Sequence, residues 1–433
     1  MLARAVVILG CLTVLLAAGA GAAEQPAAAP AAAADAAAAP PFPAWDAFVD
    51  GLRDLWPKMA AKLPERLRDD PQVQQEVGRL MLEALAAQSL QAISGDGDHP
   101  VFLPHANATL NIWQPNADTT YRLATIAPGG TYRLRGDAGS LRIFVMGQFG
   151  PLPTETGAGV TAISYHDFSK LRVDNRGRFD VIVSPTRPAG HRGDWWQLDA
   201  RTTSFLLRQI ASDWVKERDP TISIERLDIP VYRPRPDAAT LQSKLRRLPL
   251  AVGNTATYFV NHVEQLRRDG FVNKLKVFDV VSNLGGLLGQ FYYEGAYQLA
   301  RDEALIVETA VPKKCRYSSL ILTNDLYETT DWYNNQSSLN GSQLRVDKDG
   351  ILRVVVSATD PGVPNWLDTA GYPSGVIQGR WMECNATPIP TVRKLAVGDV
   401  RKVLPADTPA VTPHQREQAV RDRRAAAQHR PLW

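Results

Sequence analysis

The sequence predicts a mainly β protein with helical segments (α+β), built as two related antiparallel, jelly-roll-like β-sandwich halves. Three observations lead to this prediction: an internal repeat, short apolar runs between turn residues, and helical periodicity confined to a few segments. The repeat is the strongest of the three. Residues 171–188 and 344–361 are identical at ten of eighteen positions with a constant offset of 173, which indicates an internal duplication.

The residues of the repeat favour a strand–turn–strand unit. Each copy begins with Leu-Arg-Val-Asp, passes through a turn that contains Gly177 or Gly350, and ends in a run of β-branched residues. Glycine permits a positive φ in such turns, and β-branched side chains favour strands. We therefore expect the two copies to form equivalent hairpins in two halves of the same topology.

The N-terminus is typical of a secretory signal. Arg4 precedes an apolar stretch from Ala5 to Ala18, and small residues follow it. The stretch is short for a membrane span, and no later segment is long and apolar enough to be one. We expect cleavage between Ala20 and Ala23 and a soluble periplasmic or secreted protein with no integral membrane segment after cleavage.

Helical periodicity marks two regions between and before the β-rich segments. Asp70-Pro71 is a good helix start, and Val73, Val77 and Leu80 then recur on one face. A second helical region runs from about residue 238 to residue 274. The predicted order is residues 1–23 (signal peptide), 24–44 (Ala/Pro-rich disordered linker), 45–100 (N-terminal helical segment), 101–236 (first β-sandwich half), 237–289 (helical connector), 290–403 (second β-sandwich half) and 404–433 (basic C-terminal tail helix).

Composition limits the classes of function. The chain has 433 residues, 45% hydrophobic and 21% charged, a balance that can fill a globular core. A net charge of +3 is too small to indicate nucleic acid as a partner. The basic residues of the C-terminal tail indicate a solvated helix, with a site for an anionic partner as the alternative. They are Arg416, Arg421, Arg423, Arg424 and Arg430.

Two cysteines remain after the signal peptide is removed. Cys315 and Cys384 either form a disulfide in an oxidising compartment or stay as separate thiols. Two cysteines cannot make the usual four-ligand zinc site, and no two histidines have the spacing of a helical metal pair. The sequence also lacks the nucleophile elbow, the phosphate-binding loop and the dinucleotide fingerprint. We expect no metal and no cofactor.

The C-terminal half carries distinctive strings, from Asp331 to Gly341 and from Asp360 to Gly371, followed by Gly379-Arg-Trp381. With Asn116 to Arg122 and Asp194-Trp-Trp196 as supporting matches, the chain resembles the bacterial family catalogued as domain of unknown function 1214, often found together with domain 1254. The resemblance covers residues 45–403. It implies paired jelly rolls with intervening helices, and it implies no activity.

Polar and aromatic side chains are dense in these strings. Aromatic rings stack on sugars while amides, carboxylates and guanidinium groups bond their hydroxyls, so the density favours a hydroxyl-rich ligand. The alternative is that these side chains hold long loops together. The predicted substrate-binding residues are Trp332, Tyr333, Asn335, Asn340, Asn365, Trp366, Asp368 and Arg380.

Asp331 and Asp360 are the candidate catalytic residues, as the paired carboxylates of a glycan hydrolase or lyase. The leading hypothesis is therefore binding or processing of a carbohydrate or cell-envelope glycan. One alternative is a non-catalytic protein that binds a ligand or interacts with the cell envelope. Another is a pocket for an apolar small molecule, lined by Phe291, Tyr292 and Tyr293.

Overall fold

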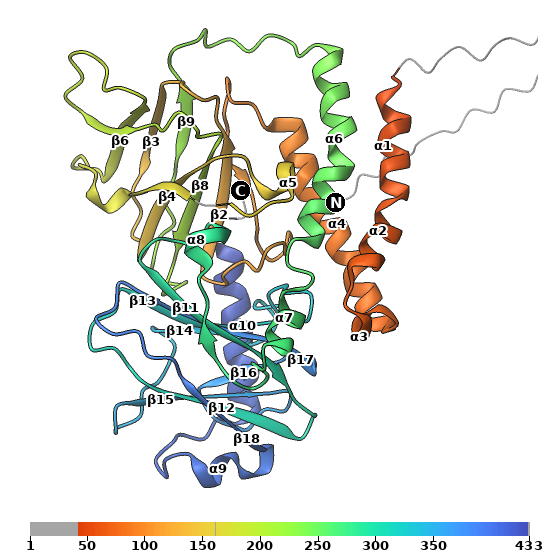
Figure 1. Ribbon diagram of the computed structural model, residues 1–433. Coiled ribbons are helices and arrows are strands. Elements are labelled where there is room, and N and C mark those ends of the chain that lie inside the picture. Colours follow the sequence, from red (N-terminus) through yellow and green to blue (C-terminus); the bar gives the residue numbers. More distant parts are fainter. Residues whose placement is uncertain (1–41, 161, 432–433) are drawn as a thin grey trace, which may run out of the picture. The chain divides into compact units, whose positions relative to one another are not determined.

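The computed structural model describes residues 42–160 and 162–431 (Figure 1). The predicted signal peptide and residues 24–41 of the predicted linker lie outside the described residues. The described chain begins with four helices: α1 (Ala44–Arg53), α2 (Leu55–Lys62), α3 (Glu65–Arg68) and α4 (Pro71–Ser94). Asp70 caps α4 as predicted, because its carboxylate accepts the amide hydrogens of Gln72 and Val73.

The first half, as far as its residues are described, contains nine strands and one short α-helix. The strands are β1 (Leu103–Pro104), β2 (Thr119–Thr125), β3 (Tyr132–Asp137), β4 (Ile143–Phe149), β5 (Ala162–Asp167), β6 (Arg178–Ser184), β7 (Asp194–Gln197), β8 (Ser204–Ile210) and β9 (Ser223–Arg226), with α5 (Pro153–Thr156) after β4. They form a five-stranded sheet of order β1-β2-β8-β4-β5 and a four-stranded sheet of order β7-β6-β3-β9. Between them lies an apolar core that includes Phe205 and Leu207.

The connector and the second half follow. The connector holds α6 (Ala238–Thr257), α7 (His262–Arg268) and α8 (Val280–Leu284). The second-half strands are β10 (Lys276–Val277), β11 (Gln290–Gln298), β12 (Glu303–Ala310), β13 (Tyr317–Thr323), β14 (Ser338–Asn340), β15 (Ile351–Ser357), β16 (Trp366–Asp368), β17 (Ser374–Met382) and β18 (Thr391–Ala396). The sheets have the orders β10-β11-β17-β13-β14 and β16-β15-β12-β18, and α9 (Val400–Val403) and α10 (Pro413–His429) end the chain.

The two halves have the same topology, strand for strand. Adding nine to each strand number of the first half gives the order of both sheets in the second half. The register agrees as well: Tyr132 lies opposite Val183 in the first half, and Leu305 lies opposite Val356 in the second. Tyr132 and Leu305 are 173 residues apart, and so are Val183 and Val356, which is the offset of the sequence repeat. The prediction of two related β-sandwich halves is confirmed.

The repeated segment differs from the predicted hairpin in one respect. Its turn and its second arm are as expected, since Gly177 and Gly350 have φ of 76° and 79° and β6 and β15 follow them. The first arm, Leu-Arg-Val-Asp, is not a strand in either copy. Instead Asp174 holds the turn, because its carboxylate accepts the amide hydrogens of Arg176 and Arg178. The strand that flanks β6 or β15 at one edge of each four-stranded sheet is the parallel strand β7 or β16.

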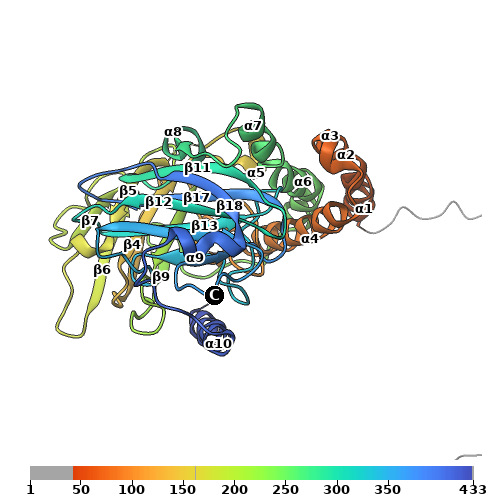
Figure 2. The ribbon, with the colours of Figure 1, turned by 90° about the horizontal axis from the view of Figure 1, so that it is seen from below.

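The helices α1–α4 and α6 lie together on one side of the sheets (Figure 2). Leu80 of α4 and Leu248 and Val252 of α6 share one apolar cluster, which explains the predicted helical periodicity. Within the described residues, no helix combines the length and apolar character needed to cross a bilayer. Cys315 and Cys384 form a disulfide, so the first of the two alternatives for these residues is the one observed.

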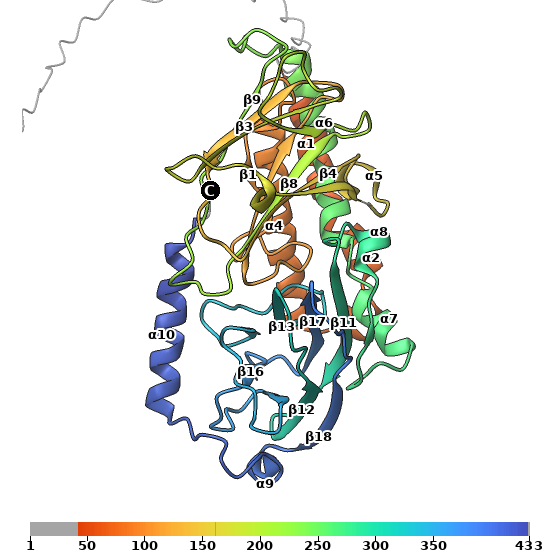
Figure 3. The same ribbon diagram turned by 90° about the vertical axis from the view of Figure 1, so that its left-hand side faces the viewer.

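The C-terminal helix α10 does not match the prediction of a solvated tail. Arg430 binds the carboxylate of Asp219 in the first half, at 2.8 and 3.0 Å. Arg416 binds Asp360 in the second half at 2.9 Å, and Arg423 is buried against the ring of Trp214. The helix thus bonds to both halves, and Figure 3 shows it running alongside them. Only Arg421 and Arg424 of the five tail arginines are exposed as predicted.

Candidate functional site

The predicted catalytic carboxylates are bonded into the fold. Asp331 accepts the amide hydrogens of Tyr333 and Asn334, which makes it a turn residue. Asp360 accepts hydrogen bonds from Arg416 and from the amide of Gly362. Of five cavities formed by the described residues, none is lined by either aspartate. The structure therefore does not bring these two carboxylates to a common cleft.

The predicted aromatic ligands are mostly packing residues. Trp366 is 6% exposed, lies in the apolar cluster with Ile306 and Val355, and donates its indole hydrogen to Ser357. Trp332 is buried, and together with Tyr333 it lines only a cavity of about 30 Å³, which is room for water and little more.

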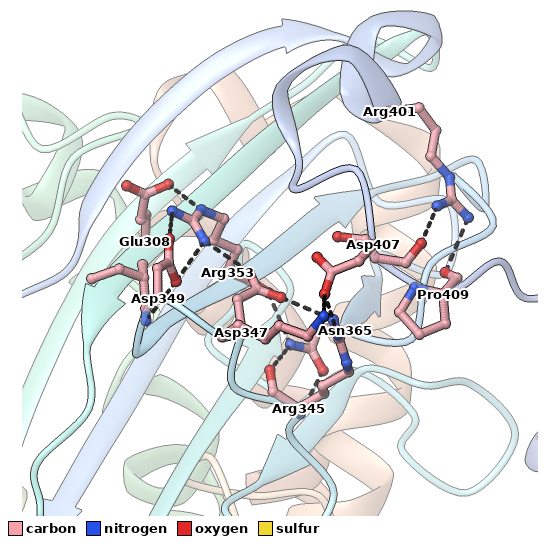
Figure 4. A network of polar contacts seen from close by, with 12 residues as sticks. Glu308, Arg345, Asp347, Asp349, Arg353, Asn365, Arg401, Asp407 and Pro409 are labelled. Atoms are coloured by element: carbon pink, nitrogen blue, oxygen red, sulfur yellow. Dashed lines mark hydrogen bonds and ion pairs between the residues drawn. The ribbon is translucent and has the colours of Figure 1, made fainter.

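The predicted amide and carboxylate ligands hold loops together. Asn340 donates to Asp118 and to the carbonyl of Ser212, and so joins the two halves. The side-chain amide of Asn365 accepts the backbone amide hydrogen of Arg345 and donates to the carbonyl of the same residue. Figure 4 shows it within the ion-pair network around Arg353. Asn335 donates to the carbonyl of Asp331, and Asp368 accepts the amide hydrogen of Ala370. This is the loop-holding alternative that the sequence left open.

Arg380 is the predicted site residue that the structure places in a substantial pocket. The pocket has a volume of about 140 Å³ and lies where the two halves meet. Tyr292, from the apolar-pocket hypothesis, lines it too. Phe291 and Tyr293 do not, because alternate side chains of β11 point to the other face of the sheet, where they join the core of the second half.

The alternation of strands explains which side chains reach the pocket. On β8, Phe205 and Leu207 face the core of the first half, while Leu206, Arg208 and Ile210 face the pocket. On β17, Ile377 and Trp381 face the core of the second half, while Gln378 and Arg380 face the pocket. Each five-stranded sheet thus has one face in its own core and one toward the other half.

Arg208 and Arg380 occupy the same position in the duplicated fold. Arg208 lies opposite Tyr121 on β2, and Arg380 lies opposite Tyr292 on β11. Two residues further along, Ile210 lies opposite Ile143, and Met382 lies opposite Tyr317. The pocket therefore receives one guanidinium group from each half, at equivalent sites on central strands.

The guanidinium groups are held in place without carboxylates. Arg208 donates to the carbonyl of Gly285 at 2.6 Å, and its Cζ lies 5.8 Å from the ring centres of Phe149 and Tyr165. Arg380 is 3% exposed and donates to Gln378 at 2.6 Å and to Gln114 at 3.4 Å. Among the described residues, neither arginine forms an ion pair, and no lining residue is Asp or Glu.

Four buried polar atoms of the lining have no hydrogen-bond partner among the described residues. They are Nη1 of Arg208, Nε2 of Gln114, the hydroxyl oxygen of Tyr258 and Oε1 of Gln290. Buried polar atoms are nearly always paired, so a group of such atoms around one pocket is a feature that needs an explanation. Three of the four can donate a hydrogen bond, which suits an anionic or acceptor-rich ligand.

The nearby carboxylate Glu294 is already occupied. It accepts from His262 at 2.7 Å and from the Tyr327 hydroxyl at 2.8 Å. Its connection to Arg380 runs through Gln378, which donates to the Tyr327 hydroxyl and accepts from Arg380. This network fixes the side chain of Arg380 and links it to the carboxylate of Glu294 through Gln378, without a direct ion pair.

Both arginines act on the electrostatics of neighbouring lining residues. Burial raises the pKa of Tyr292, and the positive charges of Arg380 and Arg208 act against that rise; the Cζ atom of Arg380 lies 5.6 Å from the centre of this ring. Burial, together with the charge of Arg208, lowers the pKa of His105 to about 4. His105 is therefore neutral near pH 7, and the net charge of the lining is positive.

The remaining lining is apolar and largely aromatic. Its members include Ile112, Trp113, Phe149, Leu206, Phe259 and Phe278. A second cavity of about 400 Å³ lies between α4, α6 and the first half, and shares His105 and Leu152 with the pocket. Its lysine has a partner, since Lys244 donates to the carbonyl of Gly95, and its lining includes the carboxylate of Glu155, whose pKa burial raises and the charge of Arg247 acts to lower. The pocket between the halves is the better candidate site.

Comparison with known proteins agrees with the fold and adds no activity. The chain is similar to an uncharacterised protein from Burkholderia cenocepacia of known crystal structure, with 27% identity and a TM-score of 0.76 over 82% of this chain and 98% of that one. It also matches the VPA0106 protein from Vibrio parahaemolyticus, with 12% identity and a TM-score of 0.42 over 74% of this chain and 99% of that one. No family model and no curated protein matches the chain, so the resemblance to domain of unknown function 1214 stays a prediction.

Proposed function

We propose that the protein binds a small molecule that combines a carboxylate with an apolar body, in the pocket between the two halves. One observation carries this proposal: Arg208 and Arg380 face an apolar pocket whose described lining has no carboxylate. A buried guanidinium without a counter-charge is costly, and a carboxylate can satisfy it with short, charge-assisted hydrogen bonds. Apolar rings around the same pocket suit the rest of such a ligand.

The lining favours binding over the hydrolysis expected from sequence. Its described residues supply no carboxylate, thiol or serine hydroxyl that would act as an acid, a base or a nucleophile in glycan cleavage. Apart from Arg380, the residues predicted for glycan recognition pack in apolar clusters or bond to loops. Of the hypotheses drawn from the sequence, the pocket for a largely apolar small molecule, to which Tyr292 belongs, agrees best with this geometry.

Benzoate is a suitable first probe, and calorimetry with thermal-shift measurements provides the test. We expect the double variant, Arg208→Gln with Arg380→Gln, to weaken benzoate binding about 10- to 100-fold, because it removes both guanidinium groups of the lining. Arg424→Gln is the matched control, since Arg424 is exposed on α10. Carboxylate binding that the double variant leaves unchanged would contradict the proposal, as would no binding of any carboxylate.

The protein is also proposed to be exported, as the N-terminal sequence predicts. The disulfide between Cys315 and Cys384 supports an oxidising compartment. Sequencing the N-terminus of the protein recovered from a periplasmic fraction tests this proposal. A mature chain whose first residue lies between Gly21 and Ala23 is the expected result, and a chain that retains Met1 in the cytoplasm would contradict it.

A further inference from the structure

The pocket carries two equivalent cations, and a ligand with a single carboxylate would balance only one of them. Each guanidinium is fixed by its own neighbours: Arg208 by the carbonyl of Gly285, and Arg380 by Gln378 and Gln114. The Cζ atom of Arg380 also lies 5.6 Å from the ring centre of Tyr292. Within the described lining, the two guanidinium charges have no carboxylate opposite them, so two negative charges on a ligand would neutralise the lining.

We propose that the ligand is a short dicarboxylate, with one carboxylate bound by Arg208 and the other by Arg380. This inference rests on the proposed function and specifies the ligand class at the same pocket. A buried charge without a counter-charge is unfavourable, so a second carboxylate adds more affinity than an apolar group of the same size.

Two of the three unpartnered donors of the lining fit this arrangement. One is Nη1 of Arg208 itself, and the other is Nε2 of Gln114, which is bonded to Arg380 through its oxygen. A carboxylate at each donor accepts these hydrogens. Oε1 of Gln290 is an acceptor and takes no part in carboxylate binding. Tyr292 accepts the amide hydrogen of Leu287 and keeps its own hydroxyl hydrogen for a ligand oxygen.

The volume of the pocket limits the spacer between the carboxylates. A buried cavity of about 150 Å³ accommodates benzene, and this pocket measures about 140 Å³. One aromatic ring or a chain of three to five carbons is therefore the largest spacer that we expect. The aromatic lining from Trp113, Phe149, Phe259 and Phe278 favours the ring. Isophthalate and glutarate are the corresponding probes.

Calorimetric titration of isophthalate and benzoate into the full chain and its two variants tests the proposal. We expect the wild type to bind isophthalate at least about tenfold more tightly than benzoate. Arg208→Gln and Arg380→Gln should each reduce isophthalate affinity about 10- to 100-fold, to the level of benzoate. Benzoate should lose no more than a few-fold in either variant, since one arginine remains to bind it.

The alternative outcomes separate this inference from the proposed function. If both probes bind equally well and either variant abolishes both, the two arginines share one carboxylate, which overturns the dicarboxylate and retains carboxylate binding. If neither probe nor glutarate binds the wild type, both proposals fall. Melting temperatures without ligand show whether each variant is folded. Arg208→Lys and Arg380→Lys keep the charge and should keep part of the preference for isophthalate.

Discussion

Trp366 shows how a residue that looks like a ligand contact can belong to the scaffold. Trp366 lies opposite Val355 on β15, and Trp195 lies opposite Ile182 on β6, which is the same position in the other half. Each indole donates to a serine, Ser357 or Ser184, at 3.0 and 2.9 Å. The tryptophan and its serine are thus part of the duplicated structure and not an addition to one copy.

We therefore expect Trp366→Ala to lower the free energy of unfolding by about 3–5 kcal/mol and to leave carboxylate affinity unchanged. Urea denaturation and calorimetry measure the two quantities. Trp195→Ala is a matched control, and because Trp195 is only partly buried its loss of stability should be smaller. A loss of carboxylate affinity without a loss of stability would instead indicate that Trp366 contacts the ligand.

Glu328 predicts a pH dependence of stability. Burial raises the pKa of this carboxyl group to about 8, although Asn324 donates to it at 2.7 Å. Between the ordinary carboxyl pKa of about 4.5 and this raised value, the folded protein holds a proton that the unfolded chain releases. The free energy of unfolding should therefore fall as the pH rises through this range, by at most about 1.4 kcal/mol per pH unit.

We expect the wild type to lose more stability than Glu328→Gln between pH 6.5 and pH 8. This interval avoids His105 and His166, because burial lowers the pKa of both imidazoles to about 4 and their contribution to stability is lost only as the pH falls below about 6.5. Urea denaturation at several pH values provides the measurement. Parallel stability curves for the two proteins would contradict the assignment.

At the scale of elements, α10 is a structural connection between the halves. Arg430 binds Asp219 and the carbonyls of Asp118 and Gln209, all in the first half, and Arg416 binds residues of the second half. We expect Arg416→Gln and Arg430→Gln each to lower the free energy of unfolding by about 3 kcal/mol, because each leaves a partly buried carboxylate unpaired.

Chemical denaturation measures this effect, and the same helix supplies the controls. Arg421→Gln and Arg424→Gln change exposed positions and should alter stability by less than about 0.5 kcal/mol. If all four variants lose the same small amount, α10 contributes no more than a surface helix does.

The elements also show what the sequence could and could not predict. The 173-residue offset predicted the common topology because the repeated turn and strand keep their residue types. The prediction of a solvated tail helix is wrong because three of its arginines bind partners that lie more than fifty residues away in sequence. Spacing along one helix gives no information about such partners.

The pocket was only partly predictable for a related reason. Arg380 was found through its aromatic and polar neighbours, and Arg208 was missed, because the segments around these arginines, Phe-Leu-Leu-Arg-Gln-Ile and Ile-Gln-Gly-Arg-Trp-Met, share little else. Their separation is 172, one less than the offset of the repeat. Only the strand pairing shows that the two arginines are equivalent. In the sequence, the arginine itself is the single residue that the two segments share at equivalent positions.

At the scale of the whole molecule, the halves meet through equivalent residues. Ile143 and Ile210 of the first half pack in one cluster with Tyr317 and Met382 of the second, which are their counterparts. A contact in which the same patch lies on both sides is the pattern of a symmetric dimer. Here both partners belong to one chain, so the pocket forms at their junction without a second molecule.

The equivalent positions of Arg208 and Arg380 suggest how the pocket arose in evolution. We infer that an ancestral gene encoded one half, that two copies of its product associated about a twofold axis, and that a single codon supplied both cations of the shared pocket. Fusion then let the two sides change independently: Leu206 on β8 and the polar Gln378 on β17 occupy equivalent positions, each two residues before its arginine. A present-day protein of a single half that forms a twofold dimer, with one such arginine per subunit, would be the surviving form of that ancestor. If single-half proteins of this topology are monomers with no residue of this kind, the history is wrong.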